Sequence, residues 1–97
     1  MATILLIHGA YQGGWIWQPV AKILRNQGHT VFTPTLDGCA ERSHQLRPGI
    51  TTETHGNEIA NLLFYEDVKD AVLVGTSSGG MVRAKAAELA RPRIKQL

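Results

Sequence analysis

Apolar residues along the chain alternate between short continuous runs and stretches with helical spacing. Continuous apolar or β-branched runs cover residues 4–7, 30–33 and 71–74, as is typical of strands buried on both faces of a parallel sheet. The stretches between and after these runs predict helices, and helical crossovers imply right-handed connections between parallel strands. The pattern therefore predicts one α/β domain over residues 1–97, with three parallel strands and helices on both faces. The first strand is expected to lie between the other two, in the order 2-1-3.

Capping residues mark the ends of the predicted helices. Gly28 stands where a C-terminal cap of the first helix is expected, and Thr51 or Thr52 could cap the second. The expected inward faces are Val20, Ile23 and Leu24 in the first helix and Ile59, Leu62 and Leu63 in the second. Residues 35–50 have no clear period, and a loop of this length inside a small domain is usually functional or mobile.

A Gly-x-Ser-x-Gly motif follows the third predicted strand directly and leads into the third helix. In such a turn the serine, here Ser77, has a strained backbone, so Gly75 and Gly79 stand where bulk is not tolerated. Gly80 is expected to ease the packing of the helix against the strand. The motif in this context predicts a nucleophilic serine. Two alternatives stay open: a turn without chemistry, and an anion-binding turn over residues 75–80 that uses the free N–H groups of the helix N-terminus.

A second turn, His8-Gly9-Ala10, ends the first predicted strand. Sites in α/β sheets lie beyond the carboxyl ends of the strands, so this turn and the serine turn are expected at one edge. Backbone N–H groups near Ala10 and at Ser78 could then form an oxyanion hole. His8 by itself is more often a packed, hydrogen-bonded histidine than a reacting group.

The residues around these turns carry a family resemblance. The run IHGAYQGGWIW at residues 7–17 resembles the HGAxxGGWxW signature of the methylesterase and hydroxynitrile lyase branch of the α/β-hydrolases and its bacterial esterase relatives. The similarity continues to the serine turn and implies a partial α/β-hydrolase with flavodoxin-like strand order. It implies that Ser77 is the nucleophile, that Ala10 and Ser78 supply the oxyanion-hole N–H groups, and that Trp17 packs. Gly9 stands where the lyases carry a hydroxyl residue, which favours an esterase.

The chain also departs from this family. Thr76 replaces the usual histidine before the serine, and Tyr11 lies in an altered pair near the site entrance. We expect His8, Gly9, Tyr11 and Thr76 at the pocket rim. No Asp or His follows Ser77, although the family's triad continues with an acid and then a histidine.

The missing acid and histidine determine how much esterase activity is expected of the chain alone. Weak or absent esterase activity is predicted unless a partner supplies the acid and the base. Arg83, Lys85 and Glu88 lie in a helix that the complete fold would bury, so a truncated and engineered half is the hypothesis. A non-catalytic scaffold, a self-assembling homo-oligomer and a chain completed by a C-terminal half are the alternatives.

Composition and charge limit the kinds of partner that the chain is expected to bind. The net charge is +2, and the basic residues near the C-terminus are not interleaved with aromatic residues, so no nucleic-acid partner is predicted. The lone Cys39 excludes an intrachain disulfide and fits a cytoplasmic protein. No membrane span, signal peptide, metal-ligand spacing or cofactor motif is found. The expected ligand is a small-molecule ester, with no cofactor and no metal.

Overall fold

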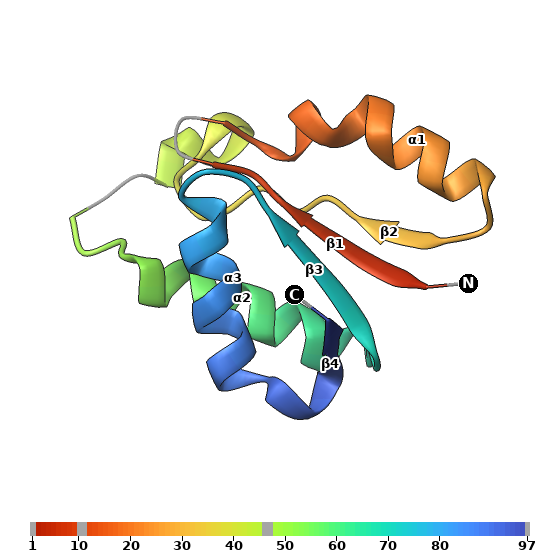
Figure 1. The fold of residues 1–97 in the computed structure, drawn as a ribbon. Coiled ribbons are helices and arrows are strands. Elements are labelled where there is room, and N and C mark those ends of the chain that lie inside the picture. Colours follow the sequence, from red (N-terminus) through yellow and green to blue (C-terminus); the bar gives the residue numbers. More distant parts are fainter. Residues whose placement is uncertain (1, 10–11, 46–47, 97) are drawn as a thin grey trace.

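The fold is a parallel sheet with helices on both sides (Figure 1). The computed structural model describes residues 2–9, 12–45 and 48–96. The regular elements are β1 (Thr3–Ile7), α1 (Gln18–Asn26), β2 (Thr30–Phe32), α2 (Thr52–Tyr65), β3 (Ala71–Gly75), α3 (Gly79–Leu89) and β4 (Ile94–Gln96). Short 3₁₀ helices cover Gly14–Trp17, Ala40–Gln45 and Arg91–Arg93.

The strand order is β2-β1-β3-β4, and every pairing is parallel. The predicted order 2-1-3 is therefore confirmed for the first three strands. Thr3 on the central strand β1 lies opposite Thr30 on one side and Ala71 on the other. All strands consequently end at one edge of the sheet, where the two predicted site turns lie.

The prediction of three strands was wrong, because β4 adds a fourth. Ile94 pairs with Ala71 and Gln96 with Val72, across a register shift. This strand lies at the edge of the sheet, where Lys95 and Gln96 are exposed and Ile94 is half-buried. Polar side chains are common on edge strands, so their presence does not prevent the backbone from pairing.

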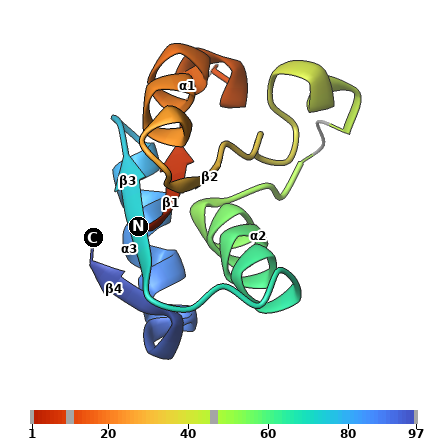
Figure 2. The same cartoon turned by 90° about the vertical axis from the view of Figure 1, so that its right-hand side faces the viewer.

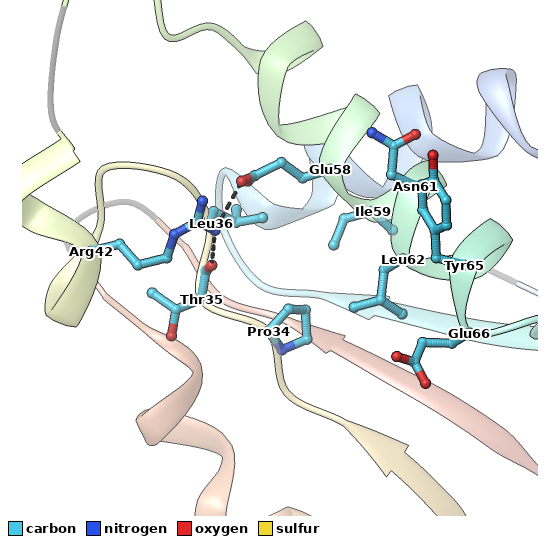
Figure 3. A pocket seen from close by; sticks show the side chains of 10 residues that line it. All are labelled: Pro34, Thr35, Leu36, Arg42, Glu58, Ile59, Asn61, Leu62, Tyr65 and Glu66. Atoms are coloured by element: carbon cyan, nitrogen blue, oxygen red, sulfur yellow. Dashed lines mark hydrogen bonds and ion pairs between the residues drawn. The ribbon is translucent and has the colours of Figure 1, made fainter.

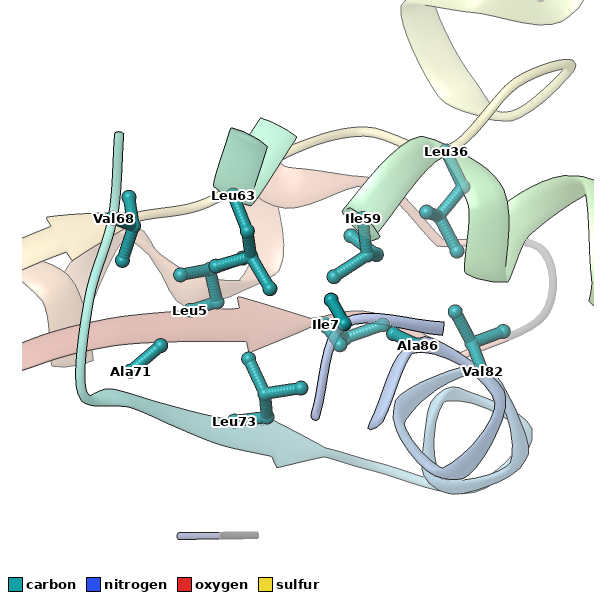
Figure 4. Close-up of a cluster of buried hydrophobic side chains, with 11 residues drawn as sticks. Leu5, Ile7, Leu36, Ile59, Leu63, Val68, Ala71, Leu73, Val82 and Ala86 are labelled. Carbon is teal, nitrogen blue, oxygen red and sulfur yellow. The ribbon is translucent and has the colours of Figure 1, made fainter. Parts of the chain in front are cut away.

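One face of the sheet, together with α2 and α3, holds the main hydrophobic core (Figure 4). Alternate residues of the strands point to this face, as the two-residue period of a strand requires. The fully or almost fully buried members are Leu5, Ile7, Leu36, Ile59, Leu63, Val68, Ala71, Leu73, Val82, Ala86 and Ala90. The expected inward face of α2 is confirmed, and the side chain of Thr51 accepts a hydrogen bond from the Thr54 N–H in a capping box.

In the described part of the chain α1 covers the opposite face, together with Trp17 from the 3₁₀ helix before it; Figures 1 and 2 show the helix on this side from two directions. Its buried cluster consists of Leu6, Ala21 and Val31. The expected inward face of α1 was wrong in part, since Val20 and Ile23 are 42% and 59% exposed. The apolar face of the helix meets the sheet through Ala21 and Leu24, and the small Ala21 allows the helix to approach the sheet closely.

The ends of α1 follow the sequence signals. Gly28 has φ 93° just beyond the helix, so the predicted glycine cap is confirmed. Trp17 packs against the cluster beneath α1, as the family resemblance implied. Among the described residues, no helix has the length and apolar character needed to cross a membrane.

Candidate active site

The predicted nucleophile Ser77 lies in the tight turn between β3 and α3. Its backbone φ is 52°, in the left-handed region that residues with a Cβ rarely adopt. The turn is closed by the Gly79 N–H, which donates to the Thr76 carbonyl oxygen at 2.8 Å. The Ser77 carbonyl oxygen accepts from the Gly80 N–H at 3.0 Å. This geometry leaves Ser77 exposed at the carboxyl edge of the sheet.

Two of the three predicted turn glycines are required by close backbone approaches. A Cβ on Gly75 would lie 2.4 Å from the Gly79 carbonyl oxygen, and a Cβ on Gly79 would lie 2.7 Å from the carbonyl oxygens of Ile7 and His8. The expectation for Gly80 was wrong, because a Cβ there would meet nothing within 4 Å. Gly75 therefore allows the turn to close tightly on itself, and Gly79 allows it to pack against the end of β1, while Gly80 faces open space.

The turn after β1 lies against the serine turn, as the sheet topology predicted. The Thr76 N–H donates to the Ile7 carbonyl oxygen at 3.3 Å. A Cβ on Gly9 would lie 3.1 Å from Ser77 Cβ, so a side chain at this position would contact the serine directly. Thr76 is exposed beside it. The predicted site residues Ala10 and Tyr11 lie outside the described residues.

Ser78 occupies the N-cap of α3 and is half-buried. No acceptor among the described residues hydrogen-bonds to its N–H, whereas its carbonyl oxygen accepts from the Met81 N–H at 3.1 Å. An N–H at a helix N-terminus lies at the positive end of the helix dipole. The Ser78 N–H thus lies at the positive end of α3, next to Ser77.

His8 is buried, with 1% of its surface exposed, and both of its ring nitrogens are engaged. Nε2 accepts from the Leu36 N–H at 2.9 Å, and Nδ1 lies 2.8 Å from the Gly9 carbonyl oxygen. The expectation of a packed, hydrogen-bonded histidine is confirmed. His8 therefore supports the loop rather than reacting, although it also lines the cavity beside it.

A cavity of about 650 Å³ opens beside the two turns. It is walled by the turn after β1, the 36–43 loop, the start of α2 and the start of α3. The described lining residues are His8, Gly9, Leu36, Gly38, Cys39, Ala40, Ser43, Ile50, Thr52, His55, Ser78 and Val82. Sequence reasoning placed only His8, Gly9 and Ser78 here. The aperiodic stretch 35–50 was the one signal that could have pointed to the other wall.

Ion pairs hold the 35–42 loop against α2, and the sequence pattern did not predict them. Arg42 pairs with Glu58 at 2.9 Å and with Asp37 at 3.7 Å. Figure 3 shows the Arg42 side chain between the Thr35 carbonyl and the Glu58 carboxylate, beside a smaller groove of about 310 Å³. Asp37, which pairs with this arginine, is 8% exposed.

The pKa values of two titratable side chains in this loop differ from their ordinary values. Burial, together with the negative charge of Glu58, raises the pKa of the Cys39 thiol. A hydrogen bond from the Thr35 hydroxyl at 2.7 Å lowers the pKa of Glu41. Cys39 is therefore held as a neutral thiol, and a protonated thiol is a poor nucleophile.

Histidines and carboxylates elsewhere in the described part do not hydrogen-bond to Ser77. His55 reaches the Asp37 carbonyl oxygen through Nε2 at 2.9 Å, and His29 Nδ1 accepts from the Ala2 N–H at 3.0 Å. His44 is exposed on the turn at Ala40–Gln45. The described residues thus supply a serine turn and N–H donors, but no base bonded to the serine.

The sequence and the fold assign the chain to a known family. The profile of the "Alpha/beta hydrolase family" matches residues 4–94, and the chain belongs to this family. The predicted fold class and family resemblance are both confirmed.

The relatives that match are enzymes of this class. The chain is 40% identical over 97 residues to a "Carbendazim hydrolyzing esterase" of Nocardioides sp. (strain SG-4G), and 30% identical over 94 residues to an "Alpha-hydroxynitrile lyase" of Arabidopsis thaliana. The match covers all of this chain and 40% of the esterase, and 96% of this chain and 36% of the lyase.

Solved structures of α/β-hydrolases superpose on this chain, in agreement with the family assignment. An extracellular α/β-hydrolase from a Paenibacillus species superposes with a TM-score of 0.88 at 32% identity, over 98% of this chain and 38% of that one. Polyneuridine aldehyde esterase superposes with a TM-score of 0.84 at 25% identity, over 99% of this chain and 40% of that one. The chain thus spans about two fifths of the length of these relatives.

Proposed function

We propose that this chain is the nucleophile-bearing part of a serine carboxylesterase that acts on small-molecule esters. The observation that carries the proposal is the backbone of Ser77, held at φ 52° in a turn whose close backbone contacts leave no room for a Cβ at Gly75 or Gly79. A strained serine between a strand and a helix is the geometry of a nucleophile elbow. Relatives named as esterases support the reaction class.

In the proposed reaction Ser77 Oγ attacks the ester carbonyl carbon and its proton passes to a base. The negative charge that develops on the carbonyl oxygen is stabilised by the Ser78 N–H and by the N–H of Ala10. Collapse of this intermediate expels the alcohol, which takes up the proton, and leaves an acyl-enzyme that water hydrolyses. In this proposal a complementing segment or a second copy of the chain supplies the base and its acid partner, since none of the described histidines bonds to Ser77.

The chain alone is expected to react slowly. A serine without its base is a weak nucleophile, although an oxyanion hole and binding retain roughly 10³–10⁴-fold catalysis over water. The cavity beside Gly9 and Ser78 offers space for one side of a neutral ester, because none of the described residues that line it carries a carboxylate or an ammonium group.

Covalent labelling of Ser77 tests the proposal. The purified chain is treated with a fluorophosphonate probe and analysed by intact mass, together with Ser77→Ala and the matched control Ser78→Ala. The proposal predicts that the wild-type chain is labelled slowly, at no more than one probe per chain, that Ser77→Ala is not labelled, and that Ser78→Ala, which keeps its backbone N–H, is labelled like the wild type. Labelling that persists in a folded Ser77→Ala variant would show that the reactive serine lies elsewhere.

A further inference from the structure

The cavity beside the serine turn also reaches the start of α2. Gly9 and Ser78 line it next to Ser77, and Thr52 and His55 line it from the first turns of α2. Its volume of about 650 Å³ lies within the range of roughly 300–1,000 Å³ that is usual for small-molecule sites. A ligand in this cavity therefore contacts both the surroundings of the candidate nucleophile and α2.

Apolar side chains contribute much of the cavity wall. Leu36 and Val82 belong to the main core and also line the cavity, and Cys39 and Ile50 are half-buried in the same wall. Burial raises the pKa of the Cys39 thiol, and a neutral thiol behaves as a small apolar group. A wall of this kind favours the apolar body of an organic ligand, such as an aromatic ring.

His55 adds to this wall a polar group whose hydrogen-bonding role is fixed. Its Nε2 lies 2.9 Å from the Asp37 carbonyl oxygen, and because a carbonyl oxygen only accepts, Nε2 carries the ring proton. In the neutral ring Nδ1 is then an acceptor. Among the described residues, none hydrogen-bonds to this Nδ1. The half-buried ring thus presents one acceptor for a donor on a ligand.

The other polar side chains of the wall do not select for a donor in this way. Ser43, Thr52 and Ser78 carry hydroxyl groups, and a hydroxyl group both donates and accepts, so it serves ligands of either kind. His8 is engaged through both ring nitrogens. Among the described side chains of the wall, His55 is therefore the one that presents an acceptor without a competing donor.

We propose that the cavity binds an uncharged, ring-sized organic group that carries an O–H or N–H donor, and that His55 Nδ1 accepts this donor. The consequence for catalysis rests on the proposed function: the ring is then part of the ester that Ser77 attacks. His55 is in that case a specificity-determining residue and not a base. The expected substrates are esters of aromatic groups that bear a hydroxyl or an N–H.

Binding of two small probes to the ¹⁵N-labelled chain tests the proposal without catalysis. Phenol and anisole share a ring, and at pH 8 they differ in the O–H donor. Phenol is expected to bind about three- to tenfold more tightly, as one hydrogen bond between neutral groups provides. Phenol, but not anisole, is expected to shift the ¹⁵N resonance of His55 Nδ1 upfield, since an unprotonated ring nitrogen responds in this way when it accepts a hydrogen bond.

Two variants assign the preference to His55. His55→Phe removes the acceptor and keeps a ring, so phenol and anisole are expected to bind with similar Kd, and anisole binding shows that the cavity persists. Thr52→Val is the matched control, because it removes a polar group from the same wall and is expected to keep the preference for phenol.

Several results would overturn the proposal. They are equal binding of the two probes to the wild-type chain, no binding of either probe, an Nδ1 resonance that phenol does not move, and a preference that survives in a folded His55→Phe variant. Should His55→Phe fail to fold, the wild-type Kd values and the Nδ1 resonance still decide the question.

Protection of Ser77 from the fluorophosphonate separates this inference from the proposed function. Phenol is expected to slow labelling of the wild-type chain more than anisole does at equal concentration, and the two are expected to protect His55→Phe equally. A chain that is never labelled contradicts the proposed function, while the Kd values still decide whether the cavity selects a donor. Labelling that bound phenol does not slow supports the serine chemistry and rejects the cavity as part of the ester site.

Discussion

The two faces of the sheet differ in how completely this chain covers them. On the α2 and α3 side, neighbouring residues such as Leu73 and Ile59 are almost fully buried in one continuous core. On the α1 side, Val72 and Val74 of β3 stay half-buried, and Ile23 is exposed on the helix itself. The serine turn leads into α3, on the well-covered side. This difference indicates that the candidate site is supported by the better-packed face of the sheet, which α2 and α3 cover.

The largest expected difference in the free energy of unfolding is between substitutions at two adjacent residues of β3 that point to opposite faces of the sheet. Leu73→Ala is expected to lower the free energy of unfolding by about 3–5 kcal/mol, because it empties space in a close-packed core. Val74→Ala is expected to lower it by about 1 kcal/mol, since that side chain is half-buried. Urea denaturation of both variants measures the difference. Equal losses would show that the two faces are equally well packed.

The next effect lies within the serine turn. Gly79→Ala forces a Cβ against the carbonyl oxygens of β1 and is expected to cost about 2–4 kcal/mol, as for other overpacked positions. Gly80→Ala has open space around its Cβ, so it should be neutral or stabilise α3 by up to about 1 kcal/mol. Thermal unfolding of the pair is the measurement. A destabilised Gly80→Ala variant would mean that this position is packed after all.

A smaller effect is expected on the exposed stripe of α1. Ile23→Gln removes an apolar side chain that is 59% exposed, and surface changes of this kind usually alter stability by less than about 0.5 kcal/mol. Sedimentation of the wild-type chain and of this variant shows whether the stripe also mediates self-association. A loss of 2 kcal/mol or more on denaturation would place Ile23 in the core instead.

The smallest effect concerns Cys39. Its thiol pKa is raised by burial and by Glu58, so the folded state favours the protonated thiol. The stability that follows is fully present below the ordinary thiol pKa and is lost as the pH rises through the raised value. Alkylation by iodoacetamide at pH 8 should therefore be slower in the folded chain than in urea. Faster alkylation of the folded chain would contradict the raised pKa.

Much of the fold could be predicted from the sequence because local signals agreed with one another. Strand runs, the Gly28 cap and the Thr51 cap were all confirmed. The strand β4 was missed because pairing at a sheet edge is a backbone property that polar side chains conceal. The inward stripe of α1 was misjudged because the closest approach, at Ala21, depends on the sheet beneath it.

The candidate site was predictable only in its turns. Ser77 and its glycines follow from a motif whose steric demands can be read from residue types. Two contacts near the site join residues that are distant in sequence. Arg42 forms an ion pair with Glu58, and the Leu36 N–H donates to His8. Charges alone do not reveal such pairings, since surface arginines have many alternative partners.

The central claim is that Ser77 stands in a nucleophile elbow competent for ester hydrolysis. The most direct measurement replaces the matching two fifths of the carbendazim-hydrolysing esterase with this chain, so that the remainder of that relative follows β4. We predict that the folded chimera hydrolyses p-nitrophenyl acetate and that Ser77→Ala abolishes the activity. A folded chimera that is inactive, or one whose activity survives Ser77→Ala, would contradict the claim.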